Sequence, residues 1–183
     1  MILRPVHRRD IAPIRNFIRH LSWQSRYMRF HAAVNDLSES QWRYLVSADG
    51  RDHVSFVAWK GHEVVGVACY VRLERSPDKA EIAFVVADAL QRRGLGNLMC
   101  RELVIAARRS GIRSFRAEVL AGNRAMRRLL RSSSLKVVLD NDDAIEVALD
   151  QASTRSSYSS GPLWIRDLGR DLRTDDFKIQ LFQ

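Results

Sequence analysis

The stretch that decides the fold is AEIAFVVADALQRRGLGNLMCRELVIAARRS, residues Ala80 to Ser110. At its start Ile82, Phe84 and Val86 recur at every second position, which is the pattern of a strand. A turn with two glycines follows, and apolar residues then recur at helical spacing as far as Gly111, a typical helix end. Because the first-turn N–H groups of a helix lack partners within that helix, this arrangement predicts an anion-binding site.

The turn, QRRGLG at residues 91–96, adds two arginines suited to binding phosphate. It lacks the lysine of a P-loop, and Met99 occupies the place of the third glycine in the dinucleotide-binding pattern. What remains resembles the Gln/Arg-x-x-Gly-x-Gly/Ala pattern of the GNAT acetyltransferases, whose loop binds the pyrophosphate of acetyl-CoA. The resemblance implies acetyl-CoA as cosubstrate, and an ordinary strand-to-helix turn is the alternative interpretation. The residues implied in pyrophosphate binding are Gln91, Arg92, Arg93, Gly94, Leu95, Gly96 and Asn97.

Further periodic segments predict the rest of the fold. Strands are expected at residues 2–6, 54–59, 64–72, 114–120, 135–139 and 145–149, and helices at 11–21, 25–33, 38–46 and 124–131. We expect Asp10 to cap the first helix, Ser38 and Gln41 to form a capping box on the third, and residues 75–78 to form a turn. The pattern predicts an α/β (α+β) fold, with a mixed, mostly antiparallel sheet of about six to seven strands and helices on both faces, as in the GNAT fold.

Residues 1–150 are interpreted as one GNAT domain, since a chain of 183 residues with 46% hydrophobic content can form a substantial core. The serine-rich residues 151–162 are expected to be a linker. The C-terminal extension, residues 163–183, regains an apolar pattern. We expect it to dock on the domain or on another subunit, which leaves a homodimer open.

The location and the metal content can also be predicted. No apolar run approaches 18 residues, and the N-terminus has no continuous apolar leader, so we expect a cytoplasmic protein with no membrane partner. Cys69 and Cys100 lie singly in apolar segments, as reduced core cysteines do. The histidines lack metal-ligand spacing, so no metal is expected. His31 and His53 are the two to watch, although a surface or core role is favoured for each.

The net charge of +9 comes almost entirely from arginine, since lysine occurs only at positions 60, 79, 136 and 178. Such a charge suits nucleic acid or a polyanionic cofactor. It also fits a solvated surface, which we favour because the arginines are scattered along the chain. A nucleic-acid partner rests on charge alone.

Glu81 is the candidate general base. Acetyl transfer to an amine requires the acceptor ammonium to lose a proton, and an ordinary lysine has a pKa of about 10.4. Glu81 is expected on the same strand face as Ala83 and Val85, whose side chains leave room beside it. Many GNAT enzymes place a glutamate on this strand. The alternative is an exposed glutamate paired with Lys79 or an arginine.

The resemblance also implies residues that contact the pantetheine arm. Backbone groups of Phe84, Val85 and Val86 would face it, and one N–H would face the thioester carbonyl, while their side chains are expected in the core. Asn123, which precedes the helix at 124–131, would contact the arm or order the strand ends beside it, or it would cap the helix. Arg127 could meet the 3′-phosphate of the cofactor or be solvated.

Two departures concern the chemistry. Many GNAT enzymes carry a tyrosine seven residues after this asparagine as general acid to the departing thiolate, but here the position is Leu130. The usual Gly-Phe that ends the segment is Ser134-Leu135. A weakly catalytic acyl-CoA-binding module is therefore an alternative to an enzyme.

Residues 21–49 and 80–126 are also similar to the catalytic domain of bacterial protein lysine acetyltransferases of the Pat type. In that subfamily a strand glutamate is the base and the tyrosine is often absent. Such enzymes commonly carry a cyclic-nucleotide-binding or acyl-CoA-synthetase-like domain, which we do not expect in these 183 residues. The resemblance implies an amine acceptor, with a protein lysine and a small amine or amino acid as the two alternatives.

Overall fold

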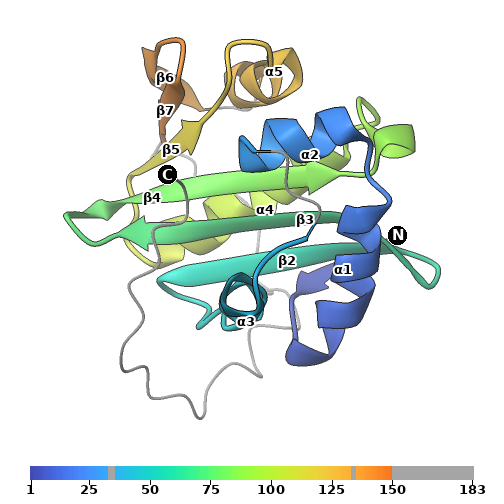
Figure 1. Cartoon of the computed structure of the whole chain (residues 1–183). Coiled ribbons are helices and arrows are strands. Elements are labelled where there is room, and N and C mark those ends of the chain that lie inside the picture. The colour runs from blue at the N-terminus through green and yellow to red at the C-terminus, as the bar shows by residue number, and fades with distance from the viewer. Residues whose placement is uncertain (33–35, 133–134, 150–183) are drawn as a thin grey trace.

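A seven-stranded sheet runs through the computed structural model, which describes residues 1–32, 36–132 and 135–149. The strand order is β1-β2-β3-β4-β5-β7-β6, and among the described strands β4 and β5 are the only parallel neighbours (Figure 1). The mixed, mostly antiparallel sheet is thus confirmed. The expected linker at 151–162 and the extension at 163–183 lie outside the described residues. The strands are β1 (Ile2–Pro5), β2 (His53–Lys60), β3 (Glu63–Leu73), β4 (Ser76–Val86), β5 (Ser114–Glu118), β6 (Lys136–Asp140) and β7 (Ala144–Ala148).

Helices cover both faces of the sheet. Three α-helices separate β1 from β2, and one follows each of β4 and β5. They are α1 (Ile11–Arg19), α2 (Trp23–Phe30), α3 (Glu39–Val46), α4 (Leu95–Arg109) and α5 (Arg124–Ser132), with short 3-10 turns η1 (Arg8–Asp10) and η2 (Asp88–Leu90). Within the described ranges, none of these helices is long and apolar enough to cross a membrane.

Two hydrophobic cores follow from this layering. On one face, Met99 and Leu103 of α4 pack with strand residues such as Ile82 of β4. On the other, residues of α1, α2 and α3 pack with Val85 of β4. Strand β4 therefore contributes its alternate residues to the two cores, as the period-2 pattern predicts.

Strand β4 begins earlier than expected. The turn lies at residues 74–75 rather than at 75–78, because Ser76 already pairs with Leu73 of β3. The ladder to β3 then skips to the pair Arg72 and Ala80. Pro77 lies in the skipped part, where its missing N–H costs no hydrogen bond to β3.

The two expected helix caps have different outcomes. Ser38 accepts a hydrogen bond from the N–H of Gln41 and the capping box on α3 is confirmed. Asp10 does not cap α1 with its side chain, so that prediction is wrong. Its carboxylate instead accepts hydrogen bonds from Arg4 at 2.6 and 2.7 Å and from the N–H of His7 at 2.8 Å. A buried ion pair to β1 therefore takes the oxygens that a cap would have used.

Candidate functional site

A cavity of about 740 Å³ lies where β4 and β5 part, which is within the usual size range of ligand pockets. Its walls come from α2, β4, the β4–α4 loop, the start of α4, the end of β5 and α5. Figure 1 shows β5 turning away from β4 on the side of α2 and α5. Ten of the expected site residues line it: Glu81, Phe84, Val85, Val86, Gln91, Arg92, Gly94, Gly96, Asn97 and Asn123.

The cavity exists because the two parallel strands pair only briefly. The β4–β5 ladder covers Lys79, Ala80 and Glu81 and ends there. Beyond Glu81, β4 has no strand neighbour on that side within the described residues. Its backbone groups on that edge are left to other partners, as expected for a strand that receives an extended amide-bearing ligand.

The loop before α4 contains two residues with a left-handed backbone conformation. Arg92 has a φ of 60° and Gly94 a φ of 88°, both in the left-handed region. Such a conformation is costly for a non-glycine residue and is found most often at functional sites. The loop delivers Gly96 and Asn97, in the first turn of α4, to the cavity wall. Leu95, between Gly94 and Gly96, is buried in the core, and Arg93 is exposed outside the cavity lining.

Asn123 joins two helices across the cavity. Its side-chain oxygen accepts a hydrogen bond from the N–H of Met126 at 3.1 Å, which confirms the helix cap on α5. Its side-chain nitrogen donates to the carbonyl of Met28 in α2 at 3.4 Å. One asparagine therefore sets the distance between α2 and α5 on either side of the opening.

The arginines of α5 divide between two faces. Arg127 is outside the cavity lining: its guanidinium donates to Asp140 at 2.6 Å and to backbone carbonyls at residues 119, 141 and 142. Arg131 also pairs with Asp140. Arg124 and Arg128, one turn apart on the other face, line the cavity. They are the α5 cations available to a bound phosphate.

Glu81 lies half-buried in the cavity wall, at the last pair of the β4–β5 ladder. Burial raises its pKa, and the negative charge of Glu118 raises it further, while Arg29 and Arg116 oppose the shift. Lys79 does not pair with it, because the ammonium of Lys79 contacts Glu146 at 2.7 Å. In the described part of the chain, no cation lies within ion-pair distance of Glu81.

Two residues around Glu81, Arg29 and Glu118, were not selected from the sequence, whereas His31 was one of the two histidines to watch. Arg29 of α2 and Glu118 at the end of β5 line the cavity, as does His31, which ends α2 with a φ of 54°. Burial lowers the pKa of His31, with Glu118 acting against the shift and Arg29 adding to it. Only the approach of α2 to β4 in three dimensions brings them together. His53, by contrast, is buried and stacks on Tyr44, so the core role favoured for it is confirmed.

Leu130 is fully buried in the core, so its position offers no proton donor. No tyrosine is among the described residues that line the cavity. Ser134 lies outside the described residues.

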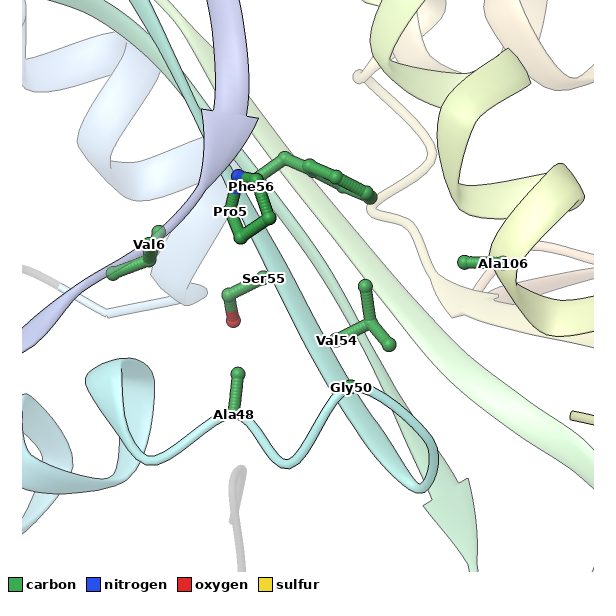
Figure 2. A pocket seen from close by; sticks show the side chains of 8 residues that line it. All are labelled: Pro5, Val6, Ala48, Gly50, Val54, Ser55, Phe56 and Ala106. Atoms are coloured by element: carbon green, nitrogen blue, oxygen red, sulfur yellow. The ribbon is translucent and has the colours of Figure 1, made fainter. Parts of the chain in front are cut away.

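A second hollow is too small to compete as a ligand site. It measures about 30 Å³, enough for a water molecule or two. Figure 2 shows its mostly apolar lining between β1, the loop before β2, β2 and α4. No group of three or more metal-ligating side chains is found in the ranges that the structure describes.

Comparison with known proteins identifies the family. Residues 15–134 match the family model described as the acetyltransferase (GNAT) family. The chain belongs to this family. The prediction of acetyl-CoA as cosubstrate is confirmed at the level of the family.

Three relatives agree with the family, two of them are named Pat, and the one solved structure among them agrees with the fold. The acetyltransferase Pat of Mycolicibacterium smegmatis is 33% identical over 130 residues, 70% of this chain and 39% of that protein. An acetyltransferase of Pseudomonas aeruginosa is 30% identical over 151 residues, 80% of this chain and 81% of that protein. The GNAT domain of S. lividans PAT superimposes with a TM-score of 0.74 at 29% identity, covering 81% of this chain and 89% of that one. The chain thus spans well under half the length of the mycobacterial Pat.

Proposed function

We propose that the protein transfers the acetyl group of acetyl-CoA directly to an amine, with Glu81 as general base. The position of Glu81 carries the proposal. Its carboxylate lies in the cavity wall, free of an ion pair with any described residue, on the strand that leads into the cofactor loop. A raised pKa makes it a better proton acceptor than an ordinary glutamate.

The reaction would use the backbone as well as the carboxylate. The amine nitrogen attacks the thioester carbonyl, its proton passes to Glu81 directly or through water, and the carbon–sulfur bond breaks. A backbone N–H next to Val85, that of Phe84 or Val86 on the unpaired edge of β4, would stabilise the developing oxyanion. With Leu130 in the core, the thiolate leaves unprotonated or takes a proton from water.

A protein lysine is the favoured acceptor, because the relatives include proteins named Pat. A small amine stays the alternative. A thiol-release assay against a panel of lysine peptides and small amines separates the two. Thermal unfolding with and without acetyl-CoA tests cofactor binding on its own, and an unchanged melting temperature at millimolar cofactor would contradict the proposal. The cytoplasmic location and the homodimer stay predictions.

Replacing Glu81 tests the base. We expect Glu81→Gln to lower kcat about 100-fold or more, since a general base contributes roughly 10²–10⁴-fold, and to leave the dissociation constant for acetyl-CoA nearly unchanged. Glu63→Gln is the matched control, because Glu63 is exposed at the start of β3 and outside the cavity lining. Equal turnover in Glu81→Gln and the parent protein would exclude Glu81 as the base.

A further inference from the structure

Asp88 links the cofactor loop to helix α2. It begins the turn η2, directly after β4, and its carboxylate accepts three hydrogen bonds from residues more than 60 positions away. The N–H and the hydroxyl of Ser22 donate at 2.9 Å each, and the hydroxyl of Ser25 donates at 2.5 Å. Ser22 is the N-cap of α2, so Asp88 holds the first turn of that helix.

Gln91 extends the same network from within the cofactor loop. Its side-chain nitrogen donates to the hydroxyl of Ser25 at 2.9 Å, to the carbonyl of Val86 at 3.3 Å and to Asp88 at 3.3 Å. The amide of Gln91 is thus directed toward α2 and the end of β4. In this position its side chain connects the loop to the helix.

Helix α2 is held at both ends by the two segments that resemble cofactor-binding motifs. Asp88 and Gln91 hold its first turn, and Asn123 bonds the carbonyl of Met28 in its last turn. Directly after Met28, α2 carries Arg29, which lies near Glu81 in the cavity wall. The position of α2 therefore depends on the same loops that are expected to close on acetyl-CoA.

We propose that Asp88 is a positioning residue that couples cofactor binding to acceptor binding through α2. The inference rests on the proposed function, since it requires the cofactor to bind the 92–97 loop and the amine to approach Glu81. Binding of the cofactor, which orders the loop, would also order α2. The α2 side of the cavity wall would therefore be in place for the amine only after acetyl-CoA is bound. Cofactor and acceptor would then strengthen each other's binding by the same factor.

The charge of Asp88 suits this role. Partial burial acts to raise its pKa, but hydrogen bonds from Ser25 and Ser22 outweigh burial, and the pKa lies below the ordinary aspartate value. The carboxylate is therefore ionised at neutral pH. Hydrogen bonds to an ionised acceptor are stronger than those to a neutral amide, so Asp88→Asn weakens the link while keeping the shape of the side chain.

Hydrogen exchange with coenzyme A as the probe tests the proposal. In the parent protein we expect coenzyme A to slow amide exchange both in residues 92–97 and in residues 24–30 of α2, by about fivefold or more in the helix. In Asp88→Asn the loop should still be protected, whereas the protection of α2 should be lost. Asp142→Asn is the charge-matched control, on an exposed turn away from the cavity lining, and should behave like the parent.

Steady-state kinetics with a lysine peptide that the protein acetylates give a second test of the proposal. Asp88→Asn should raise KM for the peptide about fivefold or more and change the dissociation constant of coenzyme A much less. Ser25→Ala should likewise raise KM for the peptide and change the dissociation constant of coenzyme A much less. Ser25→Thr, which keeps the hydroxyl, should restore the parent values. These serine variants also serve if Asp88→Asn fails to fold.

The outcomes separate this inference from the proposed function. Protection of the loop without protection of α2 in the parent protein would overturn the coupling and leave the cofactor site intact. Protection of α2 that persists in both Asp88→Asn and Ser25→Ala would also overturn it. Protection of neither segment would contradict the cofactor site itself.

Discussion

Gly94 and Gly96 lie two residues apart in one turn, yet they are glycine for different reasons. Gly94 has a φ of 88°, and a Cβ there would meet nothing within 4 Å, so its backbone conformation requires glycine. Gly96 is helical, and its Cβ would approach Leu129 at an ordinary contact distance of 3.4 Å while lying in the cavity wall. Because neither its backbone conformation nor its packing requires glycine, we infer that Gly96 is glycine to leave space for a ligand.

Alanine substitutions should separate these two reasons. Gly94→Ala should destabilise the fold by about 1–2 kcal/mol, because a left-handed conformation is costly for alanine, and should weaken coenzyme A binding through the altered loop. Gly96→Ala should keep or raise the melting temperature, because alanine favours the helix, while it weakens coenzyme A binding. Thermal unfolding without ligand and a coenzyme A titration measure the two effects. Undiminished affinity in Gly96→Ala would contradict the clearance argument.

At the scale of elements, α5 illustrates how one helix serves two purposes. Arg127 and Arg131 fasten it to β6 through Asp140, whereas Arg124 and Arg128 face the cavity. Both pairs have the same i, i+4 spacing, so spacing alone does not tell which pair faces a ligand. The packing of α5 against β6 and β7 decides which pair of arginines faces the cavity.

The two faces of α5 should respond differently to substitution. Arg128→Gln should lower the affinity for coenzyme A about tenfold more than that for dephospho-CoA, which lacks the 3′-phosphate, because a hydrogen bond to a charged group is worth about 1.5–3 kcal/mol. Arg131→Gln is the matched control on the same helix and should affect both ligands equally. Arg127→Gln should lower the melting temperature instead, since four acceptors lose their donor. Equal losses for both ligands in Arg128→Gln would exclude it from the phosphate site.

Most of the fold could be predicted from local patterns, because alternation along β4 and helical spacing along α4 reflect burial by their own neighbours. The loop at residues 91–96 could be predicted too, since Gly94 is required by backbone geometry within the loop itself. The wall of the cavity on the proposed acceptor side could not be predicted from local patterns. Arg29 and His31 lie at the end of α2 and Glu118 at the end of β5, and only the tertiary contacts of α2 and β5 with β4 bring them to one cavity.

On the scale of the whole molecule, many of the scattered arginines connect elements instead of forming one binding face. Arg4 joins β1 to η1 through Asp10, and Arg15 and Arg19 both pair with Asp36. Arg72 pairs with Asp52 across the β2–β3 side of the sheet. These arginines are engaged in contacts between elements and are not gathered on one face, which weakens the argument from clustered charge for a nucleic-acid partner, although the net charge of +9 is unaffected.

His53 should make the stability of the whole fold depend on pH. Burial lowers its pKa from 6.5 to about 4, so the unfolded chain binds a proton in this range that the folded protein does not. The free energy of unfolding should therefore fall as the pH drops from about 6.5 to 4, by up to about 3 kcal/mol at 1.36 kcal/mol per pKa unit. Urea unfolding across this range measures it. His53→Gln should flatten the slope, while His62→Gln, on an exposed turn, should not.

The short β4–β5 ladder has a consequence for the order in which parts of the protein unfold. Within the described residues, strand pairing between the sheet of β1 to β4 and the smaller sheet of β5, β7 and β6 is limited to three residue pairs, beside the ion pair of Lys79 with Glu146 and shared core packing. The smaller sheet and α5 are therefore the unit that should detach first under force or mild denaturant. A ligand lying in the cavity contacts both parts, and so should convert two successive unfolding steps into one. The opening that we propose admits the cofactor should thus also be the line along which the ligand-free protein divides.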